Sequence, residues 1–87
     1  MRNILVVCKD YASIKKEISI FNAYDKKYCG IAKINVTQKF VELGDNRFVF
    51  VTKDEKEKVM GLFLSGFWVV GEPLPSDLMA LIYTRIR

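Results

Sequence analysis

Blocks of apolar residues, separated by polar turns, divide the chain into predicted strands and helices. Strands covered on both faces are predicted at two short runs: Asn3–Cys8, which is apolar from Ile4 onward, and Phe67–Val70, which is apolar throughout. The second run lies between Gly66 and Gly71 and holds the single Trp, so we expect it to be a central strand of the sheet. Ile31–Val36 predicts a further, less pronounced strand.

A β-hairpin is predicted where Gln38–Leu43 and Arg47–Thr52 flank the turn-forming triplet Gly44-Asp45-Asn46. Both faces of this hairpin are apolar, so we interpret it as part of a sheet covered on two sides. The alternative is an exposed row of aromatic rings that stacks bases or contacts a partner. Alternation along each strand predicts Phe40, Phe48 and Phe50 on one face and Val41, Leu43, Val49 and Val51 on the other.

Three helices are predicted from apolar residues spaced three and four apart. Ser13 is the expected N-cap of the first, which runs to about Tyr24. Thr52 and Glu55 have the spacing of a capping box for a second helix that ends near residue 64, and Ser76 caps the third. The expected inward residues are Ile14, Ile18 and Phe21 in the first helix, Val59, Met60, Phe63 and Leu64 in the second, and Leu78, Leu81 and Ile82 in the third.

These elements predict a single α/β domain over residues 1–87, with a small mixed sheet, a β-hairpin and about three helices packed on it. A composition that is 51% hydrophobic and 13% aromatic favours a packed core over disorder. No apolar run approaches the roughly 18 residues that cross a bilayer, and no segment has the pattern of a signal peptide. We therefore expect a cytoplasmic protein with no membrane partner.

Candidate chemistry is sparse. The chain has no His and two Cys, which argues against the usual zinc sites and against Ser-His or Cys-His catalysis. We expect no enzyme activity, no metal and no cofactor. Cys8 beside Lys9, or Glu72 as a general base, would be the candidates for catalysis, and Asp10 and Glu72 are interpreted as solvated loop charges.

The order of motifs resembles the middle of the ATPase domain of phage large terminases and related helicase-like P-loop enzymes. Ile4–Ile14 looks like that family's strand, turn and helix, and Asp45–Thr52 looks like its hairpin. Met60–Phe63 followed by Phe67–Glu72 has the cadence of a helix leading to the Walker B strand. The resemblance covers about residues 3 to 73 and rests on the order of weakly specific motifs.

Two departures from that family decide what the resemblance implies. The chain has no Gly-x-x-x-x-Gly-Lys-(Ser/Thr) loop to hold a triphosphate. Gly71 stands where the family has the first residue of its Asp-Glu pair, and Glu72 remains beside it. The resemblance therefore implies a relative that kept the sheet and lost ATP hydrolysis. Convergence of small α/β proteins on the same order is the other explanation.

Two functions follow from this pattern. The first is a non-enzymatic protein-binding module, a small phage or mobile-element protein that modulates or inhibits a larger host or viral machine, or that forms a homodimer through an edge strand. Its predicted binding residues are Phe63, Trp68, Glu72, Pro73 and Leu74. The alternative, which a net charge of +4 permits, is nucleic-acid binding through Lys9, Lys15, Lys16, Lys33, Lys39, Arg47 and Lys53.

Overall fold

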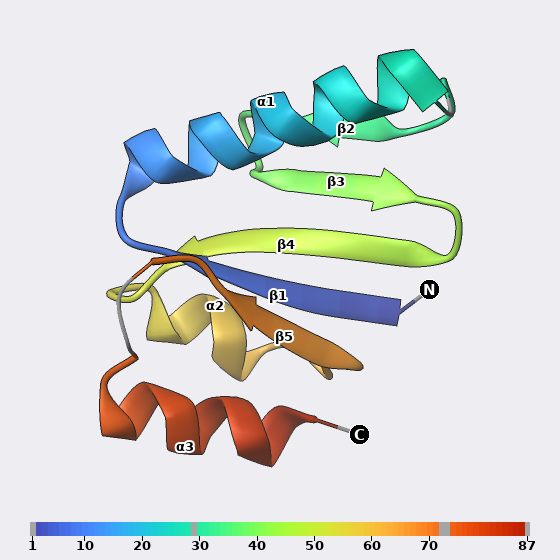
Figure 1. Ribbon diagram of the computed structural model, residues 1–87. Helices are drawn as coiled ribbons and strands as arrows, with labels where there is room; N and C mark the ends of the chain where they lie inside the picture. Colours follow the sequence, from blue (N-terminus) through green and yellow to red (C-terminus); the bar gives the residue numbers. More distant parts are fainter. Residues whose placement is uncertain (1, 29, 72–73, 87) are drawn as a thin grey trace.

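The computed structural model describes residues 2–28, 30–71 and 74–86, which form a five-stranded mixed sheet with three helices (Figure 1). The strands lie in the order β2-β3-β4-β1-β5; β1 is parallel to β4 and β5, and β2, β3 and β4 are antiparallel neighbours. The predicted α/β class, with its mixed sheet and hairpin, is confirmed. The elements are β1 (Arg2–Cys8), α1 (Tyr11–Tyr28), β2 (Lys33–Asn35), β3 (Phe40–Leu43), β4 (Asn46–Thr52), α2 (Lys56–Met60), β5 (Gly66–Val69) and α3 (Ser76–Arg85).

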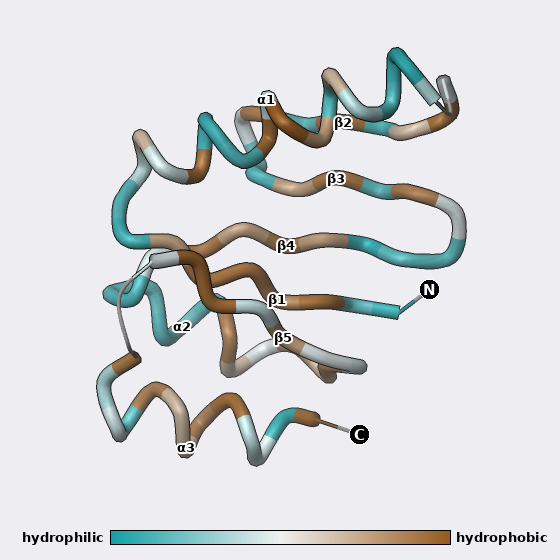
Figure 2. Tube along the Cα trace, viewed as in Figure 1, coloured by the Kyte–Doolittle hydropathy of each residue, from teal (hydrophilic) through white to brown (hydrophobic). Residues whose placement is uncertain are grey.

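Strand β1 is the centre of the sheet. It pairs with β4 on one side and β5 on the other, so that Ile4 lies opposite both Phe48 and Gly66. Figure 2 shows its hydrophobic segment running through the middle of the fold. The four consecutive residues from Leu5 to Cys8 are buried because one side of the strand faces α1 and the other faces α2 and α3. The predicted buried strand Asn3–Cys8 is therefore confirmed.

The expectation of a central strand at Phe67–Val70 is wrong. These residues form most of β5, which lies at the edge of the sheet and pairs with β1 alone. The apolar run reflects two different environments. Phe67 packs on the core beneath α3, whereas Trp68, on the opposite face, leaves 49% of its surface exposed.

The hairpin is confirmed, but the predicted distribution of its side chains over the two faces is wrong. A two-residue turn makes Leu43 the partner of Asn46, so Phe40 lies opposite Val49 and Val41 lies opposite Phe48. Directly paired residues share a face of the sheet, so odd-numbered residues of β3 accompany even-numbered residues of β4. Side chains alternate along each strand as predicted. The two-residue turn, however, changes which residues of the two strands share a face.

The sheet separates two apolar clusters, and each cluster defines a face. On the α1 face, helix α1 packs against β4, β1 and β3; on the α2–α3 face, the two shorter helices cover the other side (Figure 1). An ion pair between Lys56 and Asp77 links α2 to α3 at the surface. The buried residues are Val6, Cys8, Ile14, Ile18, Val41 and Phe50 on the α1 face, and Leu5, Val7, Val51, Val59, Leu64, Leu78 and Ile82 on the α2–α3 face.

Helix α1 starts earlier and ends later than predicted. Its cap is Asp10, whose carboxylate accepts a hydrogen bond of 2.8 Å from the Ser13 N–H, so Ser13 lies inside the first turn. The helix continues beyond Tyr24 to Tyr28. The strand that follows is shorter than the predicted Ile31–Val36, since β2 spans Lys33–Asn35.

Helix α2 is a short helix of five residues rather than one that reaches residue 64. One half of the predicted capping box is present, because the Glu55 carboxylate accepts a hydrogen bond of 2.9 Å from the Thr52 N–H. Burial raises the pKa of Glu55, but hydrogen bonds from Lys58 and Thr52 outweigh it and hold the pKa below its usual value. Met60 and Phe63, expected to face inward, are exposed at the end of this helix and beyond it.

Helix α3 begins at Ser76, one residue later than its N-cap, Pro75. The predicted cap at Ser76 is therefore displaced by one position. Leu78 and Ile82 are fully buried and Leu81 packs beside them, as predicted.

Candidate functional site

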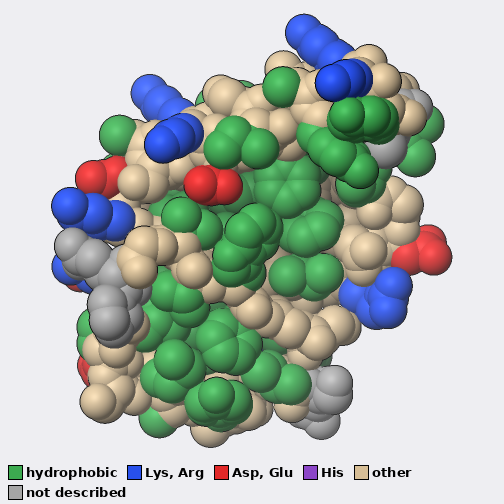
Figure 3. Space-filling model, viewed as in Figure 1, with side chains coloured by type: hydrophobic (Ala, Val, Ile, Leu, Met, Phe, Trp, Pro, Cys, Tyr) green, Lys and Arg blue, Asp and Glu red, His purple; other side chains and the backbone are tan. Residues whose placement is uncertain are grey.

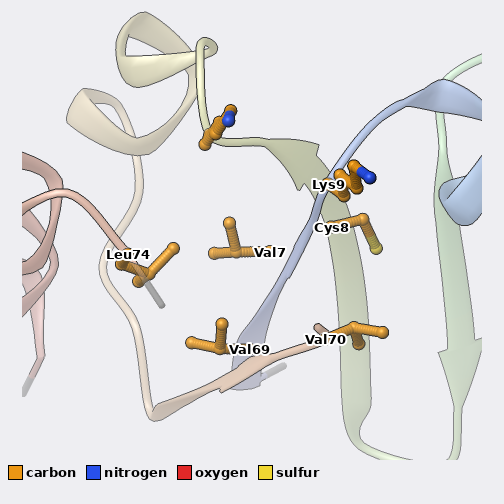
Figure 4. A pocket seen from close by; sticks show the side chains of 7 residues that line it. Val7, Cys8, Lys9, Val69, Val70 and Leu74 are labelled. Carbon is orange, nitrogen blue, oxygen red and sulfur yellow. The ribbon is translucent and has the colours of Figure 1, made fainter. Parts of the chain in front are cut away.

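The carboxyl ends of the three parallel strands meet at one edge of the sheet, where α/β proteins commonly bind ligands. A small cavity at this edge is lined by seven residues: Val7, Cys8, Lys9, Lys53, Val69, Val70 and Leu74 (Figure 4). It encloses about 10 Å³, room for about one water molecule. This cavity, as the described residues form it, is too small for a substrate.

Cys8 is the one described thiol, and its environment opposes reactivity. The side chain is 1% exposed, and Figure 4 shows Val7 and Cys8 on opposite sides of β1. Burial, aided by the negative charges of Glu17 and Asp10, raises the pKa of the Cys8 thiol to about 11. Because the thiolate is the nucleophile, the raised pKa makes Cys8 a poor nucleophile at neutral pH.

We expect Cys8 to react at least about tenfold more slowly with a disulfide reagent at pH 8 in the folded protein than after unfolding in urea, because burial also restricts access to the sulfur. The raised pKa lowers the thiolate fraction by about 100-fold, and the greater nucleophilicity of a more basic thiolate recovers about tenfold of that. The measurement uses Cys29→Ser, so that the absorbance change reports Cys8 alone. Equal rates in the folded and unfolded protein would show that Cys8 is accessible and activated.

The carboxylates near this edge have structural roles. Asp10 caps α1, and the hydrogen bond from the Ser13 backbone holds its pKa below the usual value. Glu72, the other candidate acid, lies outside the described residues. Among residues 2–28, 30–71 and 74–86, no three Cys, Asp or Glu side chains are grouped closely enough to hold a metal ion.

A larger hollow lies beside the start of α1 and carries positive charge. It encloses about 440 Å³ between α1 and the segment that leads into β3, with Tyr11, Lys15, Val36, Thr37 and Lys39 in its wall. The Lys39 ammonium is 5.0 Å from the centre of the Tyr11 ring, a cation–π distance. Two lysines and a hydroxyl in one hollow can bind an anion.

The structure brings only part of the predicted nucleic-acid set together. Lys9 and Lys53 follow β1 and β4 at the carboxyl edge, and Lys15, Lys16 and Lys39 lie at the same end of the molecule. Lys33 lies on β2, away from that edge, paired in register with Glu42. Arg47 forms a 3.1 Å ion pair with Glu42 and stacks over the Phe40 ring.

An apolar groove lies between α1 and strand β5, and we call it the α1–β5 groove. It encloses about 280 Å³ and is lined by Ile20, Phe21, Tyr24, Ala32, Leu43 and Trp68, with Glu17 and Asp25 beside them. Figure 3 shows hydrophobic side chains gathered over the middle of the molecule below α1, with basic side chains along the helix above them. An exposed apolar surface of this kind is typical of a docking site.

Asp25 builds one wall of the groove. It is a buried carboxylate near the end of α1, and its Oδ1 accepts hydrogen bonds of 3.0 and 2.9 Å from the N–H groups of Ile31 and Ala32. Gly30, with φ of +71°, donates its N–H to the Asp25 carbonyl at 2.6 Å and reverses the chain there. This cap holds the loop that carries Ala32 against the groove.

The predicted protein-binding residues do not form one patch. Trp68 lines the α1–β5 groove on the α1 face. Leu74 packs against the core on the α2–α3 face, and Phe63, 58% exposed, precedes β5 at the opposite end of that strand. Glu72 and Pro73 lie outside the described residues.

The sequence patterns above do not predict that α1 contributes residues to this groove. Ile20 and Tyr24 are one turn apart, outside the stripe of Ile14, Ile18 and Phe21 that packs on the sheet. A second apolar stripe on a helix that is otherwise rich in Lys is the signal that could have identified it.

Comparisons with family models, with curated proteins and with solved structures found no match to this chain. Within the part of the chain that the structure describes, each helix is too short or too polar to cross a membrane.

Proposed function

We propose that this protein is a non-enzymatic protein-binding module that docks its partner in the α1–β5 groove. The observation that carries the proposal is Trp68, which lies 49% exposed on a sheet surface beside the exposed side chains of Ile20 and Tyr24. Trp and Tyr are the residues most enriched among those that dominate binding energy at protein interfaces. The raised pKa of Cys8 and the small cavity at the carboxyl edge support a role without catalysis.

The identity of the partner stays a prediction. The resemblance to terminase and helicase-like ATPase domains suggests a phage or mobile-element protein that acts on a larger host or viral machine. A second copy of the chain is the other partner to consider, since β5 presents an unpaired edge to solvent over four residues.

The proposal is tested by affinity capture from lysate with matched variants. Ile20→Glu places a charge in the groove, and Met60→Glu makes the same kind of change at 54% exposure on α2, compared with 53% for Ile20. We expect wild type and Met60→Glu to recover the same stoichiometric partner and Ile20→Glu to recover at least about tenfold less, as for an interface hot spot.

Equal recovery with Ile20→Glu would show that the partner binds elsewhere. If no stoichiometric partner is captured and the chain sediments strictly as a monomer, the proposal fails. Circular dichroism of the three proteins checks that the substitutions leave the fold intact.

A second candidate function, anion or nucleic-acid binding, is favoured by the hollow lined by Lys15 and Lys39. Each phosphate contact releases counterions, so affinity for labelled DNA or RNA should fall steeply with salt. Absence of binding at about 50 mM salt would exclude this alternative.

A further inference from the structure

The α1 face has a position for a second helix that the described residues leave empty. Helix α1 packs against β4, β1 and β3, whereas β5 and the adjoining side of β1 carry no helix on this face. On the opposite face, α2 and α3 lie over these central and edge strands. A sheet in the middle of an α/β domain normally has both faces buried under helices. Here the exposed Trp68 lies on the part of the α1 face that no described helix covers.

Helix α1 presents a second apolar stripe to the empty position. Ile20, Tyr24 and Tyr28 follow one another at intervals of four residues, and each is more than half exposed. The Tyr24 and Tyr28 rings lie 4.8 Å apart, so the stripe is continuous. Because Ile20 and Tyr24 line the groove together with Trp68, this stripe forms the side wall and the sheet forms the floor.

The shape of the groove suits a helix better than a strand. Its wall from Glu17 to Tyr24 is about 10 Å long, which matches the span of helical anchor residues at i, i+4 and i+7. Strand addition at β5 has only four residues to pair with, and Leu64, just before β5, already donates its N–H to the Arg85 carbonyl at 2.8 Å.

The charges beside the groove indicate which charged residues the incoming helix should carry next to its apolar stripe. Lys16 lies one turn before Ile20, and Lys27 lies three residues after Tyr24, so both border the apolar stripe on its solvent side. Two acidic residues, Glu17 and Asp25, line the groove itself, and Asp25 is buried and accepts hydrogen bonds from two backbone N–H groups. On its solvent side, a partner helix with Asp or Glu beside its apolar stripe would therefore meet Lys16 and Lys27, and Glu17 would oppose it at the end nearest the start of α1.

We infer that the α1–β5 groove binds an amphipathic helix of a partner protein, with three or more apolar anchors on one face and acidic residues on the flank that meets Lys16 and Lys27. This inference rests on the proposed function, because it names the element that the protein-binding groove receives. Trp68, on the groove floor, contacts the central anchor.

The test begins with a display library of random 20-residue peptides selected on the full chain. Enriched peptides are synthesised without Trp, so that fluorescence emission comes from the single Trp of the protein, Trp68. We expect the enriched sequences to have apolar residues at i, i+3 or i+4 and i+7 with Asp or Glu beside them. Binding should move Trp68 emission to shorter wavelength, because the ring leaves water.

Charge reversal on α1 provides a matched pair of variants. The double variant Lys16→Glu/Lys27→Glu alters the groove side of the helix, and Lys15→Glu/Lys26→Glu makes the same change in charge on the other side. We expect the first to weaken peptide binding about threefold to tenfold at low salt and the second to change it less than about twofold. The difference should shrink in 0.5 M salt, about where exposed charges are screened.

Peptides that alternate with a period of two, or that carry basic flanks, would overturn the inference even if they shift Trp68 emission, and they would leave the protein-binding proposal standing. Equal weakening of peptide binding by the two double variants would contradict the inference that the partner helix carries acidic residues on its flank. Selected peptides that leave Trp68 emission unchanged would show that the groove is not the docking site, and the proposed function would fall with the inference.

Discussion

Replacing Phe50 by alanine is expected to lower the free energy of unfolding by about 3 to 5 kcal/mol, the usual cost of emptying a buried aromatic site. Phe50 is 1% exposed on β4, and its ring meets Phe21 of α1 edge to face with centroids 5.8 Å apart. The substitution removes one of the aromatic contacts that join α1 to β4. A domain of this size should lose more than about 12 °C in Tm.

The control is the same substitution at Phe63, which is 58% exposed and should cost less than about 1 kcal/mol. Urea denaturation followed by circular dichroism measures both variants. If Phe50→Ala does not fold, Phe50→Leu retains part of the volume and should lose about 1 to 2 kcal/mol. Similar losses at Phe50 and Phe63 would contradict the packing described for β4.

Replacing Asp25 by alanine is expected to cost about 2 to 4 kcal/mol, because two backbone N–H groups lose their acceptor in a partly buried loop. The same change opens the wall of the groove, since the cap that positions Ala32 is lost. We therefore expect binding of a groove ligand to weaken together with stability.

Asp25→Asn removes the negative charge but keeps an oxygen that can accept the two hydrogen bonds. The amide oxygen can still accept from Ile31 and Ala32, so the loss should fall to about half that of Asp25→Ala. Asp54→Ala, an exposed carboxylate before α2, should change stability by no more than about 0.5 kcal/mol. Equal destabilisation by Asp25→Asn and Asp25→Ala would mean that the carboxylate has another role.

Local patterns predicted the elements well, and their arrangement less well. The strand Asn3–Cys8 and a turn within Gly44-Asp45-Asn46 could be predicted because apolar runs and turn-forming residues act through neighbours in the chain. The edge position of β5 could not be predicted, because a run such as Phe67–Val70 looks the same whether its second face is covered by a helix or open to solvent. Strand order depends on pairings between distant segments, which no local pattern records.

The same limit applies to the candidate site. Trp68 is among the predicted binding residues, but its neighbours Ile20 and Tyr24 come from a helix that lies far from it in the sequence. The faces of the hairpin depended on whether its turn has two or three residues, and a change of one residue moves Phe40 to the opposite side. The alternation of side chains along each strand could therefore be predicted, but the register between the two strands could not.

The position of β1 has a consequence for biosynthesis. Strand β1 is translated before both strands that pair with it, so Ile4 has no partner until Phe48, and then Gly66, has been made. Until β4 is made, the segment from Leu5 to Cys8 has both edges unpaired, and one edge stays open until β5 is made; nascent chains in this state are prone to aggregation. A holding chaperone that recognises short apolar segments would meet its target here, and the yield of folded protein would depend on how long translation takes to reach β5.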